Sequence, residues 1–299
     1  MRSLATKASA ESLFFPLLTY LAVINALLPE VIRTLLSEPF NAAVFSGLGH
    51  SFVVWVVLFI SVRLTFEVRF NKVKTTPIYI YAGILLCGLL LIPSALLSWL
   101  IAAASAWLWL RHPMQEKHRI AATILFAMAI REPCCQLSLT LFANQILTFD
   151  AWFSSLFLPI FQIEAAVAGN TIVQANGYSL LVLTGCSAFT NMSLALLLWL
   201  TLSLLKHGEL ERRDIKHAVI LAVVVLTING LRLSVMTIDH DWYSFLHDGF
   251  GATAIEIFTF IVTLICVRRR DNYENGHSTS TGSDFIHQLI ARFKNIKNH

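Results

Sequence analysis

Charge is the property that this sequence has least of. Only 13% of its 299 residues are charged, which is about half the share found in soluble domains. Apolar residues make up 56% of the chain. The scarcity of charge excludes a cytosolic globular enzyme and a nucleic-acid-binding module, even though the formal net charge is +4. The composition predicts an all-α membrane protein that crosses the bilayer several times.

Long apolar stretches, separated by clusters of basic residues, set the expected architecture. A helix needs about 20 mainly apolar residues to cross a bilayer, and somewhat fewer where polar loops cap it. The stretch 77–110 is too long for one span, and Pro93-Ser94 can form a turn within it. We therefore expect eight transmembrane helices, over residues 13–28, 42–62, 77–92, 95–110, 120–147, 187–205, 218–236 and 252–267.

Basic residues indicate the orientation, because Lys and Arg favour the cytoplasmic side of a membrane. Eight spans place every Lys and Arg except Arg33, Arg131 and Arg232 on one side, together with both termini. We therefore expect both termini in the cytoplasm. No small-residue cleavage site follows the first apolar stretch, so we expect it to be retained as a span rather than removed as a signal peptide.

We expect residues 1–270 to form one membrane domain and residues 271–299 a cytoplasmic tail. The polar composition of 271–283 is typical of a flexible linker. Beyond it, apolar side chains recur at helical spacing beside basic ones, which fits either a short amphipathic helix on the anionic leaflet or a frayed end. These apolar residues are Phe285, Leu289, Phe293 and Ile296.

The longest predicted external segment, 149–185, contains no Lys or Arg. Within it, residues 170–183 hold two β-prone runs separated by Asn176-Gly177, a pair that readily adopts the positive φ angles of a tight turn. The pattern predicts a small two-stranded hairpin that leads into Cys186. The edge of such a hairpin can hold an extended peptide through main-chain hydrogen bonds.

Cys186 follows this hairpin at the start of a predicted span, where we expect Ser187 to open the helix. The partial positive charge of a helix N-terminus favours a thiolate, so Cys186 is a candidate nucleophile. A buried, inert cysteine is the alternative. We interpret Cys87, Cys266 and the adjacent pair Cys134-Cys135 as packing residues.

Arg232 lies in the outer third of its predicted span. A permanently charged guanidinium at that depth costs at least about 2.5–3.5 kcal/mol unless it faces a polar cavity or a partner. Alternatively, the side chain can extend its charged end to the outer headgroups. Asn229, one helical turn earlier, puts a second polar group on the same face, which favours a functional site.

His247 lies in a polar segment, 239–249, that carries two histidines and three aspartates. Such a composition raises the question of a metal site, but no recognised ligand spacing is present, so we expect no metal and no cofactor. A histidine close to a thiol can instead generate the thiolate and later protonate a leaving amine. His247 is therefore the candidate general acid and base.

Three short segments, in this order and on the predicted outer face, resemble the exosortase/archaeosortase family, and its bacterial exosortase-like branch in particular: Gly185-Cys186-Ser187-Ala188, Asn229-Gly230-Leu231-Arg232, and His247 with Gly251. The resemblance implies a cysteine transpeptidase of the bacterial cytoplasmic (inner) membrane, with Cys186, Arg232 and His247 as its catalytic residues. It implies cleavage of the C-terminal sorting signal of exported proteins, through an acyl-enzyme at the outer face. Such a signal comprises a Pro-Glu-Pro-like motif, a transmembrane helix and a basic tail. Ala188 departs from the family, which usually has glycine at this position.

The same resemblance implies the partners of the protein. They are exported proteins with such signals, the lipid bilayer, and an acceptor that is an amine or a surface glycan or lipid; we expect no nucleic acid. Polar residues near the candidate catalytic residues, namely Ser187, Asn229 and Glu256, are expected to bind substrate.

The intramembrane charges leave other interpretations open. Arg131 can pair with Glu132 or with Glu256, and Glu256 can instead shape a substrate cavity. A transporter or channel would use these charges, together with Arg232, to line a path through the membrane. A non-catalytic factor for surface-polysaccharide export is a further alternative.

Overall fold

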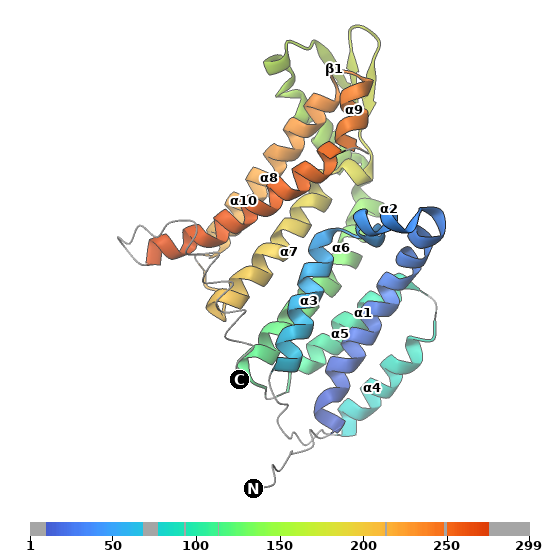
Figure 1. The fold of residues 1–299 in the computed structure, drawn as a ribbon, viewed down its shortest axis with the longest axis vertical. Helices are drawn as coiled ribbons and strands as arrows, with labels where there is room; N and C mark the ends of the chain where they lie inside the picture. The colour runs from blue at the N-terminus through green and yellow to red at the C-terminus, as the bar shows by residue number, and fades with distance from the viewer. Residues whose placement is uncertain are drawn as a thin grey trace. The chain divides into compact units, whose positions relative to one another are not determined.

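The computed structural model describes residues 10–67, 77–92, 94–112, 114–212, 214–247 and 250–274 (Figure 1). Helices dominate the described chain: α1 Ala10–Ser37, α2 Phe40–Phe45, α3 Phe52–Glu67, α4 Pro77–Leu89, α5 Ala95–Leu110, α6 Glu116–Ser155, α7 Ala188–His207, α8 Asp214–Met236, α9 His240–His247 and α10 Phe250–Glu274. Three short 3₁₀ turns and three strands complete it: η1 Gly47–Gly49, η2 Leu158–Phe161, η3 Thr184–Cys186, β1 Ala165–Ala168, β2 Thr171–Gln174 and β3 Ser179–Leu181.

All eight predicted apolar stretches are helical over most of their length, which confirms a helical membrane protein. The count of eight spans is not confirmed. Among the described residues, five helices are long and apolar enough to cross a membrane: α1, α6, α7, α8 and α10. The stretch 42–62 is shortened because positive φ angles at Gly47, Leu48 and Gly49 separate α2 from α3. Helices α3, α4 and α5 have 16, 13 and 16 residues.

Two helices run past their predicted ends. Helix α1 continues through Pro29 to Ser37, although we expected the span to stop at residue 28. A proline removes one helical hydrogen bond, and helices in a membrane protein tolerate that loss. Helix α10 continues to Glu274, into the first residues of the expected linker. The expected amphipathic tail, including Phe285 and Phe293, lies outside the described residues.

The chain divides into two compact units. Unit one comprises Met1–Leu137 and Leu204–Glu209, and unit two comprises Ser138–Ser203 and Leu210–His299. The boundary falls within α6, where Phe142 also has non-helical backbone angles. Every candidate catalytic residue named above belongs to unit two.

Unit one is built on the packing of α1 against α5, with α4 in contact with both. Fully buried alanines on α5, Ala102 and Ala106, have the small side chains that allow helices to approach closely in membranes. Hydroxyls join the helices as well. Thr19 Oγ1 donates to Ser105 Oγ at 3.0 Å.

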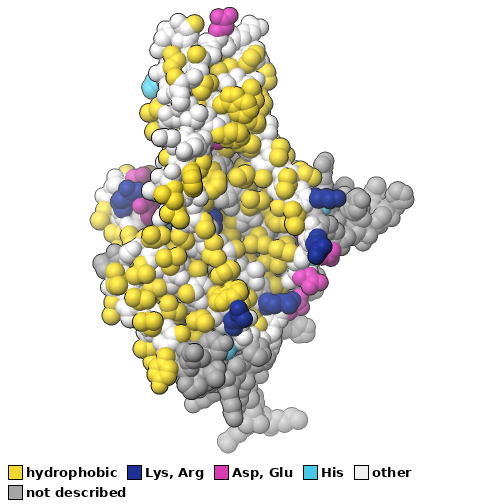
Figure 2. Space-filling view, turned by 180° about the vertical axis from the view of Figure 1, so that it is seen from behind, with side chains coloured by type: hydrophobic (Ala, Val, Ile, Leu, Met, Phe, Trp, Pro, Cys, Tyr) yellow, Lys and Arg dark blue, Asp and Glu magenta, His cyan; other side chains and the backbone are white. Residues whose placement is uncertain are grey.

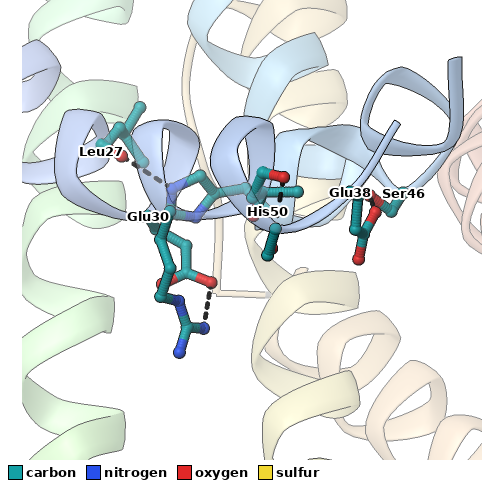
Figure 3. A network of polar contacts seen from close by, with 8 residues as sticks. Leu27, Glu30, Glu38, Ser46 and His50 are labelled. Carbon is teal, nitrogen blue, oxygen red and sulfur yellow. Dashed lines mark hydrogen bonds and ion pairs between the residues drawn. The ribbon is translucent and has the colours of Figure 1, made fainter. Parts of the chain in front are cut away.

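The C-terminal half of α1 carries a polar network, which Figure 3 shows from close by. His50 Nε2 lies 3.2 Å from Leu27 O, and Ser46 Oγ donates to a carboxylate oxygen of Glu38 at 3.3 Å. Arg33, one of the basic residues expected outside, pairs with Glu30 at 2.5 Å one turn earlier in the same helix. Glu30 and Arg33, which follow the first apolar stretch, therefore neutralise one another locally.

Unit two contains the sheet, in the order β1-β2-β3, with both pairs antiparallel. Strands β2 and β3 form the predicted hairpin. Gly177 has φ +89°, and Asn176 Oδ1 accepts a hydrogen bond from Tyr178 N at 2.9 Å. The third strand, β1, was not predicted, because the β-propensity of its Ala-Ala-Val-Ala sequence is low. The hairpin is therefore part of a three-stranded sheet.

The core of unit two surrounds Cys186. It combines apolar side chains of the sheet and the segment after it with residues of α6, α8 and α9: Leu147, Ala151, Leu158, Ile172, Leu180, Val182, Leu233, Met236 and Leu246. The side chain of Gln174 in β2 donates to Thr237 O, just past the end of α8. The sheet and α9 thus lie at the C-terminal end of α8 (Figure 1).

Candidate active site

Cys186 lies at the junction that the sequence predicted, in the turn η3 between β3 and α7. Its backbone N–H donates to Leu183 O at 2.9 Å, which closes the turn. The residue is only 4% exposed and packs in the core described above. The candidate nucleophile is therefore held in a rigid, apolar setting.

Helix α7 starts at Ala188, one residue later than expected, and Ser187 caps it. Phe189 N donates to Ser187 Oγ at 3.2 Å. The carboxylate of Asp150, from α6, accepts from Ser187 Oγ at 2.7 Å and from Ala188 N at 3.2 Å. The first N–H groups of α7 therefore have acceptors within the protein. This arrangement gives Ser187 and Asp150, rather than the thiol, the favourable position at the helix N-terminus.

Asn229 of α8 contacts both the turn η3, which holds the candidate nucleophile, and the helix α7 that follows it. Its side-chain Nδ2 donates to Cys186 O at 3.0 Å, and its Oδ1 accepts from Asn191 Nδ2 of α7 at 3.0 Å. Asn229 is 3% exposed, so these bonds form in a dry environment where an unpaired amide would be costly. The contacts tie α8 to η3 and α7.

Arg232 lies one helical turn after Asn229 and is half-buried. Its Nε and Nη2 donate to Leu246 O at 3.2 and 2.8 Å. That carbonyl belongs to the residue directly before His247. Arg232 also interacts electrostatically with Glu256 of α10, whose side chain is exposed. The guanidinium thereby connects α8 to α9 and α10.

His247 is the last residue of α9, a helix that forms most of the polar segment that begins at Asp239. Asp239 starts this helix by accepting a hydrogen bond from Trp242 N at 2.8 Å. The imidazole of His247 stacks on the ring of Tyr243, with centroids 4.9 Å apart and planes inclined by 14°. Tyr243 also packs against the core that contains Cys186.

Two glycines of the recognised segments allow close helix packing. A Cβ at Gly230 would lie 2.9 Å from Phe153 Cδ1 of α6. A Cβ at Gly251 would lie 2.8 Å from Phe245 O of α9. These positions bring α8 against α6 and α10 against α9, so the glycines serve packing at the candidate site.

Helix α8 is hydrogen-bonded to the segments that carry Cys186 and His247, at backbone carbonyls rather than at the side chains of these two residues. Cys186 O is bonded to Asn229, Arg232 is bonded to the carbonyl before His247, and Leu246 packs in the same core as Cys186. Ser187 and Asn229, expected to bind substrate, are buried, and their side chains hydrogen-bond to protein groups.

Sequence reasoning missed Asp150, which lies just beyond the predicted end of its span. Its one sequence signal is a carboxylate next to a long segment without any Lys or Arg. The structure also answers which partner the intramembrane arginine at position 131 has. Arg131 pairs with its neighbour Glu132, the first of the two partners considered.

The cysteines outside the candidate site differ in their surroundings. Cys135 is buried and Cys266 is half-buried, as packing residues are. Cys87 and Cys134 are exposed, so the expectation of a buried packing residue is wrong for Cys87, and packing of Cys134 stays a prediction.

The fold and the candidate site define a helical, membrane-embedded protein in which a buried cysteine, an arginine and a histidine belong to one compact unit and come from separate elements. The chain belongs to the transmembrane exosortase family, whose sequence profile matches residues 45–268. This match confirms the resemblance and covers all of the candidate site. No curated protein and no solved structure matched the chain.

Proposed function

We propose that this protein is a cysteine transpeptidase that cleaves the C-terminal sorting signals of exported proteins. Membership of the exosortase family supports a membrane transpeptidase in protein sorting. The observation that carries the specific proposal is that α8 is hydrogen-bonded both to the carbonyl of Cys186, through Asn229, and to the carbonyl before His247, through Arg232.

In the proposed reaction, His247 takes the proton of the Cys186 thiol, and the sulfur attacks the scissile carbonyl of the peptide. A C–S bond forms, and the negative charge collects on the carbonyl oxygen. The C–N bond then breaks as His247 returns its proton to the leaving amine, which leaves a thioester on Cys186. An acceptor amine or water attacks this thioester and releases the product.

Arg232 is suited to stabilise the oxyanion of that reaction. Leu246 O occupies its Nε and Nη2, and Nη1 donates to no residue within the described part of the chain. A guanidinium fixed on one side by two hydrogen bonds can offer its remaining donors in a defined direction. Such preorganised charge is most effective where little water is present.

The proposal extends to location and substrate contacts. Basic residues favour cytoplasmic termini, which would place the site at the outer face of the bacterial cytoplasmic membrane. Glu256 is exposed beside Arg232, so it remains a candidate for binding substrate. The transporter alternative has less support, because Arg131 is paired with Glu132 and Arg232 is bonded to a backbone carbonyl.

The proposed function is tested by following an exported protein with a C-terminal sorting signal in cells that produce this chain. We expect Cys186→Ala to abolish the mass decrease caused by signal removal, while the variant accumulates in the membrane at normal levels. Cys266→Ala is the matched control, because it removes a half-buried sulfur of the same unit and should leave processing intact. Undiminished processing by Cys186→Ala would refute the proposal.

A further inference from the structure

Asp150 is a buried carboxylate for which the proposed reaction has no use. It lies in α6, is 3% exposed, and forms no ion pair within the described residues. Removing a carboxylate from water without a cationic partner is expensive unless hydrogen bonds compensate for it. The burial of the Asp150 carboxylate therefore has to be explained by the hydrogen bonds that it accepts.

The hydrogen bonds of Asp150 converge on the residues that follow the candidate nucleophile. One oxygen, Oδ2, accepts from the hydroxyl of Ser187 at 2.7 Å and from Ala188 N at 3.2 Å. Ser187 is completely buried, and its hydroxyl oxygen also accepts from Phe189 N. Asp150 thereby fixes the start of α7 immediately after Cys186.

The other side of Cys186 is fixed from α8. Asn229 Nδ2 holds the Cys186 carbonyl at 3.0 Å. The nucleophile thus lies between two side-chain anchors, Asp150 from α6 and Asn229 from α8. Neither anchor is bonded to the sulfur, so their effect on it must come through the backbone.

The turn of α6 that bears Asp150 is itself attached to α8. Ser154 Oγ donates to Asp150 O at 2.7 Å, and Ser234 Oγ of α8 donates to Ser154 O at 2.7 Å. Phe153 fills the space that the missing side chain of Gly230 leaves. One turn of α6 therefore sets the position of α7, through Asp150, and of α8, which carries Arg232.

We propose that Asp150 is a positioning residue, whose hydrogen bonds to Ser187 and Ala188 hold the Cys186 segment in register with the helix that bears Arg232. The inference rests on the proposed function for its link to turnover. Its structural part, the anchoring of the Cys186 segment, does not depend on any substrate.

The test compares Asp150→Ala with Asp150→Asn in the full-length membrane protein. Asparagine keeps an acceptor oxygen in nearly the same place and loses the charge, whereas alanine loses both. The first readout is the rate at which iodoacetamide alkylates Cys186 without substrate, measured by peptide mass spectrometry. We expect Asp150→Ala to raise this rate about tenfold or more, as the loss of one or two hydrogen bonds would, and Asp150→Asn to stay within about threefold of the parent.

Internal and matched controls separate this effect from general unfolding. Alkylation of Cys135, which is buried in unit one, should not change in either variant. Glu164→Ala removes an exposed carboxylate of unit two and should leave the Cys186 rate unchanged. If Asp150→Ala does not fold, Ser187→Ala takes its place, because it removes one of the two contacts and should raise the rate by a smaller factor.

The second readout is turnover of the exported substrate. We expect Asp150→Ala to lower kcat with little change in KM, and Asp150→Asn to restore most of kcat. An Asp150→Ala variant with parental alkylation and kcat overturns the proposal, as does an Asp150→Asn variant as reactive to iodoacetamide as the alanine variant. Failure of the proposed function is distinguishable, because processing would then persist in Cys186→Ala while the alkylation results stand.

Discussion

Single residues at this site have two kinds of task, and Arg232 illustrates both. Two of its nitrogens bind one backbone carbonyl, which is a structural task, and in the proposed function Nη1 would serve a substrate oxygen. His247 likewise depends on its neighbours, because Tyr243 supports its ring by stacking. The proposed chemistry would therefore rely on residues whose described contacts are with the protein itself.

Arg232→Lys is the sharpest test at the residue scale. A lysine ammonium is a point charge and cannot bind Leu246 O with two nitrogens while it also offers a directed donor to an oxyanion. We expect kcat for signal removal to fall by about 10²-fold or more, in line with the loss of an oxyanion donor.

Arg131→Lys is the control for this change, since it alters another half-buried arginine, in unit one, that pairs with an adjacent carboxylate. It should process substrate at the parental rate in the same cleavage assay. Parental kcat in Arg232→Lys would show that the planar guanidinium is not required.

At the scale of elements, close helix packing assembles the candidate site. Helix α8 approaches α6 at Gly230, and α10 approaches α9 at Gly251, with distances that leave no room for a methyl group. Close to Gly230 on α8, Ser234 and Asn229 form hydrogen bonds to neighbouring elements. The site therefore needs these helices in one register.

Gly230→Ala tests this packing. The added Cβ would lie 2.9 to 3.0 Å from ring carbons of Phe153 and Phe157, so the rings or the helix must shift. We expect a loss of about 1–3 kcal/mol of stability, seen as a lower apparent Tm in detergent.

Gly88→Ala provides the comparison, because no atom lies within 4 Å of the Cβ that it would add to α4. It should leave Tm unchanged or raise it slightly, since alanine favours a helix over glycine. Equal Tm values for the two variants would contradict close packing at Gly230.

How well the sequence predicts an element depends on whether its signal is local in the chain or comes from residues far apart. Apolar stretches located the helices, and Asn176-Gly177 located the hairpin, because these signals are local. Strand β1 was missed because the β-propensity of its residues is low, whereas α9 was missed although Asp239 offers a local N-cap signal. The contact between Asp150 and Ser187 joins residues 37 positions apart, and no local pattern reveals such a pair.

At the scale of the whole molecule, the protein is adapted to a bilayer. Figure 2 shows hydrophobic side chains over much of the visible surface, and many large apolar residues are exposed, including Leu21, Phe59 and Ile257. In a soluble protein such a surface would aggregate, whereas lipid covers it in a membrane. The bilayer environment thus accounts for both the low charge of the sequence and the exposed apolar surface.

The candidate site is concentrated in unit two. The Cys186 core, the sheet and the helices that carry Arg232 and His247 all belong to this unit. Under the proposed function, a peptide that ends in a transmembrane helix would be presented to this unit from the lipid phase, and its acyl group would pass through the Cys186 thiol.

The most direct test of this account is to isolate the protein after it has met a substrate with a sorting signal and to measure the mass of the peptide that contains Cys186. We expect a thioester between Cys186 and the carbonyl at the cleavage point, which hydroxylamine releases. Cleaved substrate with no adduct in the parent, or an adduct on any other residue, would contradict it.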